Sequence, residues 1–330
     1  MPTRTGRKGA FRYRDSRRRV ITDAATLERI EALVIPPAWK DVWISPRPGA
    51  KLQATGRDAA GRKQYLYHPA FRAAQEQEKY DSLIRFGERL PALRAAMAEH
   101  LDRDELDRER VSAVALRLIS LGWFRVGSER YARDGTYGVT TLLRRHVQVR
   151  GSRVQLAFRA KAGVRVRTEL VDEELASAIR GLLAVKPGAR VFKYRWEGDL
   201  YNLTSKRLND YVKVYLGEEF SAKDFRTWGG TLCAAINFAE RVDRDEDPKR
   251  AVASVMRLVA QKLGNTPAVC RASYVAPAVV EQYLDGRTIH DFRPRHLRVV
   301  KARELDLSPE EAAMLSLLRS WRIRQARKAA

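Results

Sequence analysis

The strongest constraint on the fold is a change in the spacing of apolar residues near residue 80 of the 330-residue chain. Before this point, short β-branched and aromatic runs alternate with turn residues, which indicates strands at Val42–Ser45, Lys51–Thr55 and Gln64–Tyr67. Asp23–Leu33 is the one helix expected there. Beyond it, apolar residues recur every three or four positions, which indicates helices. The sequence therefore predicts a two-domain α+β protein with a small β-rich N-terminal domain and a larger, mainly α-helical domain.

The expected domain boundaries follow from this change. Residues 1–20 are rich in Arg and Lys, and we expect a basic arm that becomes ordered only on a partner. Residues 21–80 are assigned to the β-rich domain and residues 81–330 to the helical domain, with the boundary in a polar helical stretch.

Several helices of the second domain have clear end signals. One apolar stripe runs from Val111 to Leu121 and another from Leu175 to Leu183. A third helix opens at Asp247-Pro248 and ends at Gly264, and the last begins at a capping box, Ser308–Glu311. A β-hairpin interrupts these helices, with strands at 154–158 and 164–168 and a turn through residues 160–163.

The charge balance predicts an acidic partner. Lys and Arg number 63 against 40 Asp and Glu, which leaves a formal net charge of +23. So large a charge destabilises a compact state by self-repulsion, and a polyanion relieves it. Cys233 and Cys270 lie far apart in apolar stretches, as buried thiols do in a reducing compartment. With no apolar run near the length of a membrane span, we expect a cytoplasmic protein that is not associated with a membrane.

Two familiar cofactor patterns do not fit the sequence. The stretch Gly56–Lys63 has the glycines of a phosphate loop, but Arg62 and Lys63 stand where Lys and Ser or Thr belong, and it runs between two strands. The five histidines show no zinc spacing. We therefore expect neither a metal site nor ATP binding.

Four segments could together cut a phosphodiester without a metal. That reaction needs a nucleophile, cations on the phosphate oxygens and an acid for the leaving oxygen. Arg125 follows a helix end, Arg226 lies between aromatic residues, Lys161 lies at the hairpin tip, and Tyr274 closes a short helix that begins after Asn265. Taken singly, three of these residues have simpler interpretations: Arg125 as a capping arginine, Lys161 as a solvated turn lysine and Tyr274 as a packed tyrosine.

In combination these residues resemble the type IB DNA topoisomerases, and most closely their small poxvirus-like bacterial branch. Arg125 in F-R-x-G, Lys161 on a hairpin, Arg226 in K-x-x-R and Tyr274 in S-Y occur in that family's order. The stretches 61–67 and 137–142 are similar too, so that the resemblance spans about Val20 to Gly286. One position departs from the poxvirus pattern, because Asn265 stands where those enzymes have histidine, as is common in bacterial relatives.

The resemblance implies a mechanism. Tyr274 would attack the phosphodiester and form a 3′-phosphotyrosyl bond, Arg125, Arg226 and Asn265 would stabilise the transition state, and Lys161 would protonate the 5′ oxygen. Rotation and religation would relax supercoils without ATP or metal. The implied partner is duplex DNA, preferentially supercoiled, held by a monomer that forms a clamp. Further DNA contacts are expected from Gln64, Tyr65, Tyr67, Tyr131, Thr141 and Lys223.

Tyrosine site-specific recombinases share this chemistry and are the main alternative. Three features count against them: Lys223 stands where recombinases usually have His, Asn265 replaces another His, and the preceding domain is β-rich instead of helical. A DNA-binding architectural protein without catalysis is a second alternative, which the full set of five candidate catalytic residues disfavours.

Overall fold

The computed structural model describes residues 3–6, 10–242, 246–292 and 306–329. The chain separates into two compact units, Met1–Tyr80 and Asp81–Ala330, and each is described by itself.

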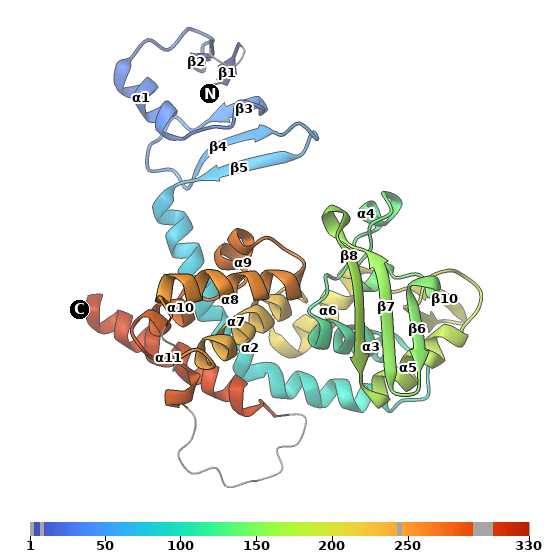
Figure 1. Cartoon of the computed structure of the whole chain (residues 1–330). Coiled ribbons are helices and arrows are strands. Elements are labelled where there is room, and N and C mark those ends of the chain that lie inside the picture. Colours follow the sequence, from blue (N-terminus) through green and yellow to red (C-terminus); the bar gives the residue numbers. More distant parts are fainter. Residues whose placement is uncertain (1–2, 7–9, 243–245, 293–305, 330) are drawn as a thin grey trace. The chain divides into compact units, whose positions relative to one another are not determined.

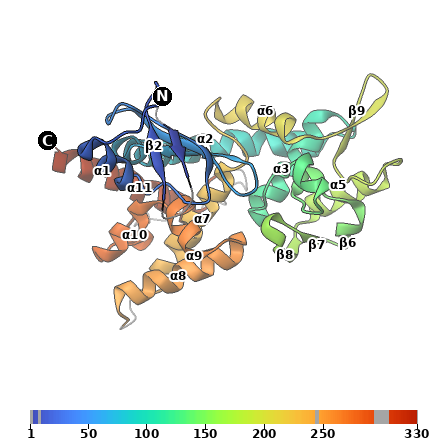
Figure 2. The ribbon, with the colours of Figure 1, turned by 90° about the horizontal axis from the view of Figure 1, so that it is seen from above.

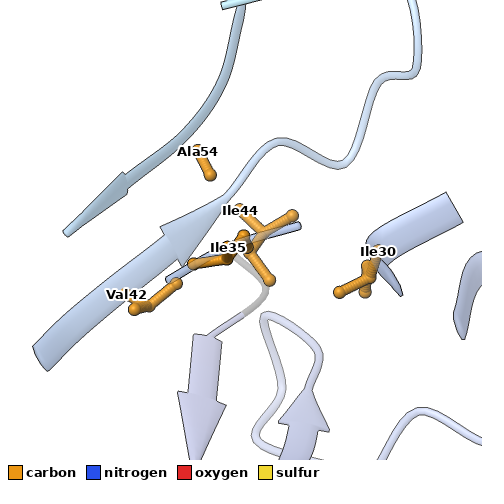
Figure 3. Close-up of a cluster of buried hydrophobic side chains, with 5 residues drawn as sticks. All are labelled: Ile30, Ile35, Val42, Ile44 and Ala54. Atoms are coloured by element: carbon orange, nitrogen blue, oxygen red, sulfur yellow. The ribbon is translucent and has the colours of Figure 1, made fainter. Parts of the chain in front are cut away.

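The N-terminal unit is built on an antiparallel sheet with strand order β2-β1-β3-β4-β5 (Figure 1). Helix α1 packs beside it, and its residue Ile30 joins Ile35, Val42, Ile44 and Ala54 in a buried cluster (Figure 3). The three strands expected from the sequence are present, with ends that shift by up to two residues. The bounds are β1 Thr3–Thr5, β2 Arg12–Arg14, α1 Ala24–Ala32, β3 Lys40–Ile44, β4 Leu52–Arg57 and β5 Lys63–Tyr67.

The described part of residues 1–20 differs from the basic arm expected from the sequence. Strand β1 pairs with β2 and, at Thr3, with Trp43 of β3, so this segment belongs to the sheet. Arg4 explains the difference. Its guanidinium donates to the carbonyl oxygens of Pro36 and Trp39, at 3.1 and 2.6 Å, and lies 4.2 Å from the centre of the Phe11 ring. The positive charge that indicated a solvated arm instead binds main-chain oxygens.

The larger unit combines helices with two small sheets. Its hairpin gains a third strand that the sequence did not reveal, giving the order β6-β7-β8, and β9 pairs with β10. The strand bounds are β6 Val147–Arg150, β7 Arg153–Arg159, β8 Arg165–Val171, β9 Lys193–Trp196 and β10 Asp199–Asn202. The helix bounds are α2 Pro69–Leu101, which begins in the first unit, α3 Arg108–Gly122, α4 Glu129–Arg133, α5 Glu173–Ala184, α6 Ser205–Leu216, α7 Asp224–Ala239, α8 Pro248–Leu263, α9 Pro267–Ser273, α10 Pro277–Leu284 and α11 Pro309–Ala329; short 3₁₀ turns lie at Val139–Thr141, Arg144–His146, Lys161–Gly163 and Ile289–Phe292.

Helix α7 is the centre of this unit. Of its 16 residues, 12 are buried, and α3, α8, α10 and α11 all contact it. Figures 1 and 2 show α8 and α10 beside it. The predicted ends of α8 are confirmed: the Asp247 side chain accepts from the Arg250 amide, and Gly264 closes the helix in the left-handed conformation. A helix enclosed on several sides keeps its side chains in fixed positions.

A buried carboxylate joins α11 to α7. The capping box is confirmed, since Ser308 and Glu311 bond to each other's main-chain amides. Glu311 also accepts two hydrogen bonds from Arg94 and one from the Trp228 indole, all at 2.8–2.9 Å. Burial alone would raise the pKa of Glu311, but the bonds and the charge of Arg94, with the Trp228 and Ser308 bonds, outweigh burial and lower it.

We predict that Glu311→Gln lowers the free energy of unfolding at neutral pH by about 2–3 kcal/mol, because Arg94 loses a buried partner. A lowered carboxyl pKa contributes stability above the unfolded-state pKa, and this is lost as the pH falls through the folded-state value. The difference from wild type should therefore be full at about pH 6 and shrink toward about pH 3. Urea unfolding followed by circular dichroism measures it.

Glu99→Gln is the matched control, because Glu99 meets Arg103 at 3.4 Å on the surface and its side chain is 73% exposed. It should change the unfolding free energy by less than about 0.5 kcal/mol. Equal losses in the two variants would contradict the role given to Glu311.

Candidate active site

Arg125 is held at the end of α3 by main-chain contacts. Trp123 takes a left-handed conformation (φ 50°) that ends the helix. The Arg125 carbonyl then accepts from the Val139 amide at 2.9 Å. Gly138 permits this approach, because a Cβ there would lie 2.6 Å from the Arg125 carbonyl oxygen. The stretch 137–142 therefore fixes the backbone that carries Arg125.

Arg226 projects from α7 into a site where it is only 3% exposed. Its two terminal nitrogens donate to the carbonyl oxygens of Trp123 and Leu263, the latter at 2.8 Å. These oxygens lie at the C-terminal ends of α3 and α8, where the helix dipole is negative. Burial, and secondly the charge of Arg125, lowers the pKa of Arg226. Its Nε is buried with no hydrogen-bond partner in the described part of the chain.

Asn265, the residue after the Gly264 cap, holds Arg125 in place. Arg125 donates to the Asn265 side-chain oxygen and, at 3.5 Å, to the Gly264 carbonyl. The amide nitrogen of Asn265 is buried and, like Arg226 Nε, meets no acceptor within the described segments. Two unused donors thus lie among the residues of this site.

Tyr274 follows the last residue of α9. The Arg226 guanidinium carbon lies 5.1 Å from the centre of its ring. Its main chain lies against α7, where a Cβ on Gly230 would be only 2.6 Å from the Tyr274 carbonyl oxygen. The glycine allows this close approach, and it stands one helical turn after Arg226. One face of α7 therefore contacts both the ring and the backbone of Tyr274.

Lys161 lies apart from these four residues. It occupies the turn between β7 and β8, and its ammonium group is 5.8 Å from the centre of the Tyr131 ring. Both residues line a hollow of about 180 Å³ that Arg125 also lines. Arg125 thus links the Lys161 hollow to the group around Tyr274.

A larger cavity of about 580 Å³ adjoins the same residues. Arg125, Arg226 and Gly264 line it, together with residues of the edge strand β8 that include Arg165 and Arg167. Four guanidinium side chains and Lys262 against one carboxylate, that of Glu169, give the lining of this cavity a net positive charge.

The expected DNA contacts vary in exposure. Tyr65 and Tyr67 are 48% and 42% exposed on β5 with stacked rings, while Gln64 donates to Asp58 at 2.9 Å. Tyr131 on α4 is 37% exposed, and Lys223 is exposed at the start of α7. Thr141 corrects its expectation: it is 1% exposed and its hydroxyl both accepts from and donates to the main chain of Gly138. Its side chain braces the Arg125 segment and is not presented to DNA.

Sequence reasoning missed Trp123, Gly138 and Gly230. Two adjacent glycines inside a helical pattern, Gly229 and Gly230, were a usable signal of close approach. Nothing in the sequence indicates the left-handed backbone conformation of Trp123.

No cluster of His, Cys, Asp or Glu among the described residues could hold a metal ion. Within the same residues, no helix has both the length and the apolar character to cross a membrane.

Comparisons with known proteins show the family of this chain. Residues 68–292 match the family model for the eukaryotic DNA topoisomerase I catalytic core, and residues 10–58 match that for the bacterial DNA topoisomerase IB N-terminal domain. The chain belongs to the type IB DNA topoisomerases. It is 31% identical to DNA topoisomerase 1B of Acanthamoeba polyphaga mimivirus, over 85% of this chain and 86% of the relative. It is 21% identical to DNA topoisomerase I of monkeypox virus and 20% to DNA topoisomerase 1B of vaccinia virus, each over 81% of this chain and 84% of the relative.

This membership confirms the fold class and the bacterial branch predicted from the sequence. The protein is an isomerase that cuts one strand of duplex DNA, permits rotation and reseals the strand, and DNA is its partner. The match of residues 10–58 to a topoisomerase N-terminal domain argues against the alternative that the protein is a tyrosine recombinase.

We predict that Gly230→Ala slows strand cleavage at least about tenfold, since the new methyl group must push the Tyr274 main chain away, and displacements near an ångström are costly in catalysis. Single-turnover formation of the covalent protein–DNA adduct measures the rate. Gly181→Ala on α5 is the control, because a Cβ there meets nothing within 4 Å. A normal rate in Gly230→Ala would show that the close approach does not position the nucleophile.

Proposed function

We propose that Tyr274 is the nucleophile of this topoisomerase and that Arg125, Arg226 and Asn265 bind the scissile phosphate. The phenol oxygen attacks phosphorus, the bond to the 5′ oxygen breaks, and a 3′-phosphotyrosyl bond holds the cut strand. Attack by the freed 5′ hydroxyl reverses the step and releases Tyr274.

The pair of unused donors carries this proposal. Arg226 Nε and the Asn265 amide nitrogen are both buried, and neither has a partner in the part of the chain that the structure describes. Arg226 also lies against the Tyr274 ring. Leaving buried donors unpaired costs about 1–3 kcal/mol each, and a phosphate oxygen would satisfy them. Donors already fixed in place stabilise the charge of the transition state without reorganisation.

Lys161 is proposed as the acid that protonates the 5′ oxygen, with Arg125 beside it. Both side chains line the 180 Å³ hollow, and a lysine on a hairpin turn can reach over a bound strand.

We further propose that the enzyme needs neither ATP nor metal, prefers supercoiled DNA, and acts as a monomeric clamp. Torsion in the DNA supplies the direction of rotation, and the phosphotyrosyl bond conserves the energy for resealing. Association with the nucleoid follows from the net charge of +23, and nonspecific affinity should fall steeply with salt. Relaxation of a plasmid in EDTA without ATP tests the cofactor statement, and loss of activity there would refute it.

We predict that Tyr274→Phe abolishes plasmid relaxation and the covalent adduct, because the ring lacks the attacking oxygen, but leaves DNA affinity within about twofold, since phosphate contacts dominate binding. Denaturing gels and filter binding measure the two properties. Tyr201→Phe removes an exposed hydroxyl on β10 and should relax plasmid at the wild-type rate. An adduct that persists in Tyr274→Phe rules out this nucleophile.

Lys161→Ala should slow cleavage of normal DNA by about 10²–10⁴-fold and recover most of that loss on DNA with a bridging 5′ phosphorothiolate, because sulfur leaves without a proton. The comparison of cleavage rates on the two substrates is the measurement. Lys206→Ala on α6 is the control and should cleave both at wild-type rates. Failure of the sulfur substrate to rescue Lys161→Ala would place the acid elsewhere.

A further inference from the structure

The joint between α9 and α10 holds Tyr274 in a non-helical conformation. Tyr274 has φ −132° and ψ −5°, and Ala276 is extended ahead of Pro277. Val275 and Ala276 are 1% and 0% exposed, so polar main-chain groups here cannot rely on water. The amides of Tyr274 and Val275 both donate to the Cys270 carbonyl. Within the described main chain, the Tyr274 carbonyl and the Ala276 amide are left without partners.

One side chain serves both groups. The hydroxyl of Thr231, on α7, donates to the Tyr274 carbonyl at 3.3 Å and accepts from the Ala276 amide at 3.1 Å. Thr231 is fully buried, and its neighbour Gly230 permits the contact. A hydroxyl is suited to this task because it can donate and accept at once.

Thr231 and Arg226 act on the same tyrosine from the same helix. The arginine lies against the ring at 5.1 Å, and the threonine holds the main chain at the Tyr274 carbonyl. Helix α9 has only seven residues and is too short to be rigid alone, whereas α7 is enclosed on several sides. The position of Tyr274 is therefore set by α7 more than by its own helix.

We infer that Thr231 is a positioning residue for strand cleavage, which fixes the main chain of Tyr274 so that the phenol oxygen faces the phosphate held by the arginines. This inference rests on the proposed role of Tyr274. Thr231 touches neither DNA nor the reacting atoms in this account; its hydroxyl acts through the joint alone.

Thr231→Val and Thr231→Ser separate this role from simple packing. Valine keeps the shape but lacks the hydroxyl, whereas serine keeps the hydroxyl and loses a methyl group. The measurement is single-turnover cleavage of a suicide duplex at saturating enzyme, with the rate and the final amount of adduct recorded separately. Thr231→Val should slow cleavage by about 10- to 100-fold, as a small displacement of the nucleophile does. The cleavage rate of Thr231→Ser should stay within about threefold of the wild-type rate. The valine and serine variants should reach the same final amount of adduct.

The rate of religation provides a second, independent measurement. Cleavage and resealing pass through one transition state, so Thr231→Val should slow resealing of a preformed adduct by a similar factor while DNA affinity stays unchanged. Thr231→Ala should show the same loss of rate, and unlike valine it places no methyl group against the Tyr274 carbonyl and the Ala276 amide. It replaces Thr231→Val if the valine variant does not fold. Ser316→Ala, which removes a hydroxyl bonded to Ala312 within α11, should leave both rates unchanged.

Three results would overturn the inference. The first is a wild-type cleavage rate in Thr231→Val or Thr231→Ala with less final adduct, which means that only folding was affected. The second is an equal loss of rate in the serine and valine variants, which means that the methyl group matters instead of the hydroxyl. The third is cleavage slowed without any change in resealing. Tyr274→Phe tests the proposed function separately, since an adduct in that variant removes the nucleophile whatever Thr231 does.

Discussion

The buried charge of Arg226 is the constraint around which the larger unit is organised. Moving a cation out of water costs several kcal/mol even after the surroundings relax. Carbonyl oxygens at the ends of α3 and α8 offset this cost, which requires both helices to stop within reach of α7. The left-handed turns at Trp123 and Gly264 follow, since each ends its helix beside the guanidinium. Asn265 then directly follows Gly264, and Arg125 lies two residues after Trp123.

The same arrangement leaves two donors of the candidate site without partners in the described part of the chain. Arg226 is held by two of its nitrogens and keeps its Nε unused, and Asn265 holds Arg125 with its oxygen and keeps its nitrogen unused. The carbonyl oxygens and the Asn265 oxygen orient the donors but bind them only in part. The two donors that remain unused point in fixed directions, along which the oxygens of a tetrahedral or pentacoordinate phosphate can accept hydrogen bonds.

The sequence predicted those parts that local chemistry determines. Capping residues placed α8 and α11, and the apolar alternation placed the hairpin that carries Lys161. It missed β6, although a two-residue turn, Gly151-Ser152, joins this strand directly to β7. It could not predict the use of Arg4 inside the sheet, because a charge looks solvated until its acceptors are known. In the candidate site, Arg125, Arg226, Asn265 and Tyr274 were predicted from their order along the chain, and their catalytic roles stay proposals. Thr231 was not, because its role depends on a break between two other helices 43 and 45 positions away.

The amide of Asn265 has a consequence for the conditions under which the enzyme works. An imidazole in its place would gain or lose a proton near pH 6.5, so the charge facing the phosphate would change across the range of acidity that living cells experience. A carboxamide has no such transition, and the guanidinium groups stay charged throughout. With Asn265 in its proposed place at the phosphate, the field from the amide and the guanidinium groups should remain constant when the cell interior becomes acidic, which suits an enzyme that must reseal every strand it cuts.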